Sequence, residues 1–210
     1  MTIRALLATA LCAVSVALAA DAIKLPAPNL GDGTLAHALQ ERQTTRVFSS
    51  QPATAQVISN LLWAATGINR PNGKRTVAVA MGRYAIELYA LTANGVFQYD
   101  VKNHTITRIS AKDCRNLADQ RRNMGGNAAV SIILVADLNT FKQLPDEKRL
   151  IFIGYEAGSI CQDIYLYCAN AGLKAVCCAG VNAPGLAKLL NLPDNTTASM
   201  SMIVGYPAEK

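Results

Sequence analysis

The chain has 210 residues, a length that favours one domain of ordinary size. Apolar residues make up 51% of the chain and charged residues 16%, proportions that exclude a disordered chain or a coiled coil. The formal charge of +6 favours anionic partners. There is no run of Lys or Arg and no recognisable nucleic-acid module, so a nucleic-acid partner is not predicted.

Residues 1–20 have the pattern of a secretory signal peptide. Arg4 supplies the positive end, residues 5–20 are apolar and rich in small side chains, and Ala17-Leu18-Ala19 fits a small-x-small cleavage rule. We therefore predict cleavage near residues 19–22, a mature domain over 21–210, and export, to the periplasm if the source is a bacterium. A retained membrane anchor is the alternative interpretation. No second hydrophobic span follows, so the mature domain is predicted to have no stable membrane span.

An amphipathic helix is predicted to run to Arg42, and either Asp32 or Thr34 can cap its start. Residues 31–36 also match the dinucleotide-binding pattern G-x-G-x-x-A. That motif needs a strand immediately before it, and the prolines of the extended stretch 23–29 argue against one. We therefore interpret 31–36 as a turn that leads into the helix, and 23–29 as an arm on the surface.

The segment Glu41–Phe48, which reads ERQTTRVF, concentrates hydrogen-bond donors just after this helix. Arg42 and Arg46 lie four residues apart, with Thr44 and a second threonine between them. Arg is always charged and presents a planar fork of donors that suits phosphate, and Thr adds short donors. The segment is a candidate phosphate site. The alternative is a solvated helix end, where Arg interacts with the negative end of the helix dipole.

A second helix is predicted to begin after Thr54 and to end at Gly67, followed by a basic loop over 68–75. Trp63 does not belong to the apolar stripe of this helix, and it is interpreted either as a residue at the edge of the core or as an anchor at an interface. Residues 84–109 predict a strand meander with a hairpin turn, and His104 is interpreted as a surface residue. The elements predicted after the meander are a short polar helix over 113–123, a buried strand over 128–135, a long central helix over 146–171, a strand over 175–181, a short helix over 186–191 and a last strand over 199–204.

Five of the six cysteines follow the leader. Cys161 and Cys168 share one helix and lie too far apart along its axis to bridge. Cys177 and Cys178 are adjacent in a strand, so their side chains point to opposite faces. We predict mostly buried thiols without a disulfide framework. The two histidines form no ligand spacing with the cysteines, so no metal site is predicted.

Taken together, several segments resemble the flavin-dependent nitroreductase family, in particular its short exported members. ERQTTRVF is similar to that family's R-x-S-x-R-x-F segment, and the resemblance covers nearly all of the chain after residue 24. The other segments that carry it are Lys24–Pro28 (KLPAP), 61–76 (LLWAATGINRPNGKRT), 154–173 (GYEAGSICQDIYLYCANAGL), 175–181 (AVCCAGV) and 204–207 (VGYP).

The resemblance implies an α+β fold with a central, mainly antiparallel sheet flanked by helices, and a homodimer with FMN at its interface. On the matching positions, it implies that the cofactor-binding residues are Arg42, Gln43, Thr44, Arg46, Gly82, Cys178, Ala179 and Gly180. Glycine at the end of the strand 175–181 lets the backbone approach a flat ligand closely. The polar residues Glu156, Gln162 and Asp163 are interpreted as bracing the core and the dimer interface. The dibasic pair Arg121-Arg122 is interpreted as a surface loop.

The function implied is an FMN-dependent oxidoreductase that takes a hydride from NAD(P)H, or from another donor, and reduces an organic acceptor, such as a nitro or quinone compound, in a ping-pong cycle. The flavin carries the chemistry, so no catalytic side chain is predicted. One departure is the stretch Val77–Gly82, which replaces a Pro-Ser-Ala-x-Asn segment that contacts the flavin in similar proteins. Two alternatives therefore stay open: an exported flavin protein that relays electrons without nicotinamide activity, and an interaction protein without a cofactor.

Overall fold

The computed structural model describes residues 21–208, which form an α+β fold around one seven-stranded sheet. The signal peptide predicted over residues 1–20 lies outside the described residues. Every neighbouring pair of strands is antiparallel, and the order across the sheet is β1-β4-β3-β2-β5-β7-β6. The strands are β1 Ala22–Lys24, β2 Ile86–Thr92, β3 Gly95–Asp100, β4 Thr105–Ser110, β5 Val130–Asp137, β6 Lys174–Cys178 and β7 Thr196–Gly205.

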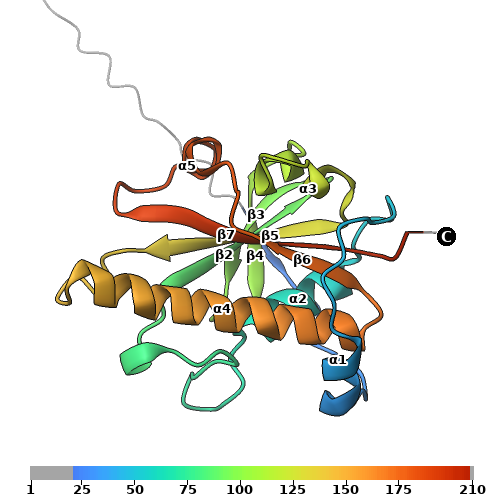
Figure 1. Cartoon of the computed structure of the whole chain (residues 1–210), viewed down its shortest axis with the longest axis horizontal. Helices are drawn as coiled ribbons and strands as arrows, with labels where there is room; N and C mark the ends of the chain where they lie inside the picture. Colours follow the sequence, from blue (N-terminus) through green and yellow to red (C-terminus); the bar gives the residue numbers. More distant parts are fainter. Residues whose placement is uncertain (1–20, 209–210) are drawn as a thin grey trace, which may run out of the picture.

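Helices cover both faces of the sheet (Figure 1). The long helix α4, with α1 and α2, lies on one face, and α3 and α5 lie on the other. The helices are α1 Leu35–Glu41, α2 Ala55–Thr66, α3 Met124–Asn127, α4 Asp146–Asn170 and α5 Ala183–Leu190, with the short 3-10 turns η1 Ala80–Gly82 and η2 Arg115–Ala118. Within residues 21–208, no helix combines the length and the apolar character that a membrane crossing requires.

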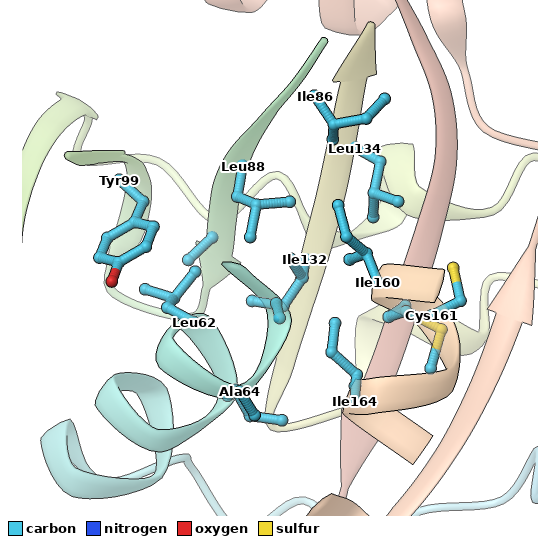
Figure 2. Close-up of a cluster of buried hydrophobic side chains, with 14 of the residues drawn as sticks. Leu62, Ala64, Ile86, Leu88, Tyr99, Ile132, Leu134, Ile160, Cys161 and Ile164 are labelled. Carbon is cyan, nitrogen blue, oxygen red and sulfur yellow. The ribbon is translucent and has the colours of Figure 1, made fainter. Parts of the chain in front are cut away.

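The middle of the sheet is buried on both faces, and the interior strand β5 shows why. Side chains alternate between the faces of a strand, so a strand with apolar neighbours on both sides needs a continuous apolar run. Ile132 and Leu134 pack toward α4, as Figure 2 shows, whereas Ile133 and Val135 belong to the core under α5. The prediction of a buried strand from the apolar run 128–135 is confirmed.

The predicted helix boundaries are confirmed at both early helices. The side chain of Thr34 accepts a hydrogen bond from the His37 N–H, and that of Thr54 accepts one from the Val57 N–H. These caps satisfy backbone donors that have no partner inside the helix. Gly67 ends α2, as predicted. Residues 25–34 form no strand, which agrees with the rejection of the dinucleotide-binding pattern.

The central helix α4 anchors the start of β2 through a buried carboxylate. Glu156 is 1% exposed, and its two carboxylate oxygens accept hydrogen bonds from the backbone N–H groups of Ala85 (2.8 Å) and Ile86 (3.3 Å). Burial raises the pKa of the Glu156 carboxyl group, while the two N–H donors oppose that effect. The prediction that this residue braces the core is therefore confirmed.

Three local predictions differ from the structure. The polar helix predicted over 113–123 is only the 3-10 turn η2, because the carboxylate of Asp119 accepts the N–H groups of the next residues and competes with helical bonding. The arm before residue 30 begins with a short edge strand, β1. His104 is half-buried rather than on the surface, and its ring bonds Ser59 Oγ (2.8 Å) and Tyr99 OH (2.8 Å).

Candidate functional site

The segment Glu41–Phe48 runs along the outer edge of β6. Thr44 forms a parallel bridge with Ala175, and the Thr45 N–H donates to the Ala175 carbonyl at 2.9 Å. Phe48, which is buried, then pairs with Pro207. An edge strand has unpaired backbone groups on one side, and here the segment uses them. The candidate phosphate residues are therefore held in an extended conformation beside β6.

Tyr165 of α4 fixes the first half of this segment. Its hydroxyl lies 3.1 Å from Thr44 Oγ1 and accepts a hydrogen bond from the Cys177 N–H at 2.8 Å. The guanidinium group of Arg42 lies over the Tyr165 ring, 5.4 Å from its centroid, a distance that suits a cation–π contact. Tyr165 thus connects the segment, β6 and α4 at one point. Sequence reasoning missed it, because nothing in the helical pattern distinguishes it from other apolar positions.

The second half of the segment faces a cavity of 420 Å³, which we call the arginine cavity. Its volume falls in the range of about 300–1,000 Å³ typical of small-molecule sites. Its lining brings together Arg46, the end of β6 and the loop after η2. The lining residues are Arg46, Asp119, Arg121, Arg122, Met124, Val176, Cys177, Cys178, Ala179 and Gly180.

The charge of the arginine cavity is positive. Its one carboxylate, that of Asp119, is 3% exposed and accepts the backbone N–H groups of Arg121 (3.0 Å) and Arg122 (3.2 Å). The two ion pairs found within residues 21–208 lie elsewhere, one inside Asp113–Arg115 and one inside Asp146–Arg149. No carboxylate in this part of the chain therefore pairs with the guanidinium groups of Arg46, Arg121 and Arg122. Unpaired guanidinium groups around a concave site attract an anionic ligand.

The end of β6 offers the cavity a backbone donor. Backbone groups alternate between the two edges of a strand, and on the outer edge the Ala175 carbonyl and the Cys177 N–H are already bonded. The next residue on that edge is Ala179, whose N–H has no partner within residues 21–208. The Gly180 N–H donates to Cys178 Sγ at 3.3 Å, so it is already in use. A Cβ atom added at Gly180 would meet only that sulfur, at 3.6 Å, so packing inside the chain does not require glycine there.

The predicted site residues thus fall into three groups. Arg46, Cys178, Ala179 and Gly180 line the arginine cavity, while Arg42, Gln43 and Thr44 lie beside it on the same segment, where the Gln43 side chain is exposed. Gly82 lies apart. It ends η1 with a positive φ of 67°, its surface is exposed, and it does not line the arginine cavity.

Sequence reasoning missed the contribution of Arg121 and Arg122. Both side chains are exposed, as a surface loop predicts, but they also line the arginine cavity. Their adjacency was the only signal in the sequence, and it says nothing about which part of the fold the pair faces. The loop reaches the cavity because the Gln120 N–H donates to the Gly180 carbonyl at 2.9 Å and the Asn182 N–H to the Leu117 carbonyl at 2.9 Å.

A second cavity, of 560 Å³, lies between α1, α2 and α4, and Trp63 and Asp163 help to line it. No hydrogen-bond partner for the half-buried Asp163 carboxylate is found within residues 21–208, and burial raises its pKa to about 6. Asn170 Oδ1, on the same lining, is buried without a partner. Gln162 is exposed, so the expectation that it braces the core is wrong, while its place at a dimer interface stays a prediction. Within residues 21–208, no three His, Cys, Asp or Glu side chains gather as a metal site would need.

The Asp163→Asn substitution is expected to stabilise the protein at pH 7 and not at pH 4. Because burial raises the folded-state pKa of Asp163 to about 6, its contribution to stability is present below an ordinary Asp pKa of about 4 and is lost as the pH rises through 6. With allowance for solvent screening of a half-exposed group, the loss is about 1 kcal/mol, or roughly 2–4 °C in Tm. Thermal unfolding of the variant and of the exposed control Asp194→Asn between pH 4 and 7 measures this. A Tm difference that does not grow with pH would contradict it.

A family model described as the nitroreductase family matches residues 39–206. A crystal structure of a Ralstonia eutropha protein named as a nitroreductase is 32% identical, covers 90% of each chain and superposes with a TM-score of 0.83. A Methanocaldococcus jannaschii protein, also named as a nitroreductase, is 25% identical over an alignment of 165 residues that covers 74% of this chain and 83% of that protein.

A more distant structure shares the fold alone. Nitroreductase A from Vibrio parahaemolyticus is 16% identical, with a TM-score of 0.60 over 85% of this chain and 70% of that chain. At such low identity the likeness supports the sheet and helix arrangement and carries no inference about substrates.

Proposed function

The chain belongs to the nitroreductase family, and from this premise we propose that it is an FMN-dependent oxidoreductase. In this proposal, electrons pass from a small-molecule donor such as NAD(P)H to an organic acceptor such as a nitro or quinone compound. When bound, FMN supplies the redox chemistry, because it can accept a hydride and reduce a second substrate in turn. The protein supplies binding, orientation and electrostatics.

One observation carries the proposal: the arginine cavity combines unpaired guanidinium groups with a free backbone donor at a strand end. The phosphate of FMN needs cationic and hydroxyl donors, which Arg42, Thr44 and Arg46 offer on one extended segment. A flat ring needs backbone that it can approach, which the stretch 178–180 offers. The donors and the shape of the site therefore fit FMN.

The chain's own residues then act by position and charge. Tyr165 holds Thr44 and the backbone of Cys177, so the donors of the site are oriented before a ligand arrives. Arg46 at the cavity lowers the free energy of negative charge that develops near it. The Ala179 N–H is placed to donate a hydrogen bond to a ligand in the cavity. No side chain is assigned as a nucleophile or as a general base.

The stretch Val77–Gly82 supports a second candidate, a flavin protein without nicotinamide activity. Val77 is buried, Val79 packs against the core, and the exposed side chain of Met81 is apolar, so this stretch offers a ligand no polar side chain. Gly82 lies outside the arginine cavity, and in this proposal it contacts FMN from a second copy of the chain. The homodimer implied by the family resemblance is therefore part of the proposal.

The visible absorption spectrum of the protein, after addition of FMN and removal of the excess, tests the proposal. We expect a bound-flavin spectrum near one FMN per chain, since the site's donors match the phosphate, and bleaching on anaerobic titration with NADPH. Flavin that stays oxidised with NADPH and NADH would favour the second candidate. A colourless protein that cannot be loaded with FMN would contradict both candidates. The remaining hypothesis would then be an interaction protein that binds no cofactor.

A further inference from the structure

Two cysteines on different elements, Cys161 and Cys177, contact each other where α4 packs against β6. Cys161 lies on α4 and is 5% exposed, and Cys177 lies on β6 and is half-buried. Their Sγ atoms are 3.6 Å apart. Figure 2 shows the Cys161 side chain on the face of α4 that packs against the sheet. A disulfide needs about 2.05 Å, so the two sulfurs have to approach by roughly 1.5 Å.

The other cysteines are not placed to compete for this contact. Cys178 points to the opposite face of the sheet, where its Sγ lies 3.7 Å from Asp119 Oδ1. Cys168 is seven residues from Cys161 on the same helix, about 10 Å along the axis. Cys114 packs with the core on the other face of the sheet. Within residues 21–208, Cys161 and Cys177 are the only two thiols in contact with each other.

We propose that Cys161 and Cys177 are a redox site, at which a reversible disulfide ties β6 to α4. The two S–H bonds break, one S–S bond forms, two protons leave, and two electrons pass to an oxidant. The oxidant is an external disulfide, which is reduced to two thiols by thiol–disulfide exchange. Such disulfides are available in the oxidising compartment that an exported protein enters.

The geometry assigns different roles to the two sulfurs. Cys177 is half-buried whereas Cys161 is buried, so Cys177 is the more exposed of the two and attacks the external disulfide first. The contact with Cys161 lowers the pKa of the Cys177 thiol, whereas that contact and burial raise the pKa of Cys161. Cys161 then attacks the Cys177 sulfur of the mixed disulfide and releases the external thiol.

The disulfide has a consequence for the site, and its formation does not depend on FMN. Cys177 immediately precedes the stretch 178–180 that lines the arginine cavity, and its N–H is bonded to Tyr165. A bond from Cys177 to α4 fixes the start of that stretch. The loop that the disulfide closes spans residues 161–177, and cross-linking a loop of this length restricts the unfolded chain. The oxidised protein should therefore be more stable than the reduced one.

Peptide mapping of the full-length protein tests the proposal. Samples equilibrated with oxidised or reduced glutathione are alkylated at low pH and digested with trypsin. Cleavage after Arg149, Lys174 and Lys188 places Cys161 and Cys177 on separate peptides. We expect the oxidised sample to contain peptides 150–174 and 175–188 joined, with two hydrogen masses lost, and its Tm to be roughly 5–10 °C higher. Both changes should reverse with reduced glutathione.

Each of these peptides carries a second cysteine, and single variants identify the pair. Cys161→Ala and Cys177→Ala should each abolish the joined peptide and the Tm increase. Cys168→Ala should retain both, and Cys178→Ala should retain the joined peptide. Unlinked peptides in the oxidised wild-type protein, or a link that survives Cys161→Ala, would overturn the assignment. The wild-type map is decisive even if one variant fails to fold.

Discussion

Replacing both Arg42 and Arg46 with alanine is expected to weaken FMN binding by about 10²–10⁴-fold. Hydrogen bonds to charged groups contribute about 1.5–3 kcal/mol each, so loss of two such contacts to the phosphate amounts to about 3–6 kcal/mol. Arg42 lies over the Tyr165 ring, and Arg46 lines the arginine cavity. Titration of the protein with FMN, followed by flavin fluorescence, gives the two dissociation constants.

The matched control is Arg108→Ala with Lys112→Ala, which removes the same charge from exposed positions on and after β4, where neither residue lines the arginine cavity. Its FMN affinity should stay within about threefold of the wild-type value, because exposed charges at a distance are screened by salt. If the Arg42/Arg46 variant binds FMN as tightly as this control, the phosphate site lies elsewhere. Single variants then show whether Arg46, at the cavity, contributes more than Arg42.

Replacing Glu156 with alanine is expected to give the largest loss of stability. The buried carboxylate accepts the N–H groups of Ala85 and Ile86, and alanine leaves both donors without an acceptor. Each buried donor without a partner costs about 1–3 kcal/mol, so the free energy of unfolding should fall by about 2–6 kcal/mol. For a chain of this length the Tm should fall by roughly 5–20 °C. Thermal unfolding followed by circular dichroism measures it.

Glu147→Ala is the control for Glu156→Ala, because Glu147 is exposed in the first turn of the same helix. It should lower stability by no more than about 1 kcal/mol, the size of a contact between an acidic residue and the helix dipole. The stability of the Glu156→Gln variant should lie between those of the two alanine variants, since the one carbonyl oxygen of glutamine can accept a hydrogen bond from one of the N–H groups. A Glu156→Ala variant as stable as Glu147→Ala would mean that water or a backbone shift satisfies the two donors.

Much of the secondary structure could be predicted from interactions between residues that are close in the sequence. Thr34 and Thr54 start helices because their side chains satisfy N–H groups within the same turn, and Gly67 ends one. The run 128–135 predicts a strand buried on both faces, since only such a strand needs apolar residues at every position. In each case the partner atoms lie within a few residues, or the pattern is a property of one element. The resemblance of ordered segments then indicated the family.

The errors arose where residues far apart in the chain decide the outcome. His104 is held by Ser59 and Tyr99, which no local pattern connects to it. Asp119 is a local exception: its carboxylate binds the N–H groups of the residues two and three positions ahead, which a helix over 113–123 would have used for itself. The sequence indicates only that Arg121 and Arg122 lie in a surface loop. Backbone hydrogen bonds from Gln120 to Gly180 and from Asn182 to Leu117 hold that loop against the end of β6.

The sequence by itself determined the helix caps, the buried strands and the family resemblance, because each depends on neighbouring residues or on a repeated spacing. The tertiary structure alone decided which cations share a cavity and which thiols meet. Cys161 and Cys177 contact each other because α4 packs against β6, and Arg46 reaches the strand end because β6 leaves one edge open. Such contacts follow from how elements pack, and spacing along one chain does not encode the distance between two elements.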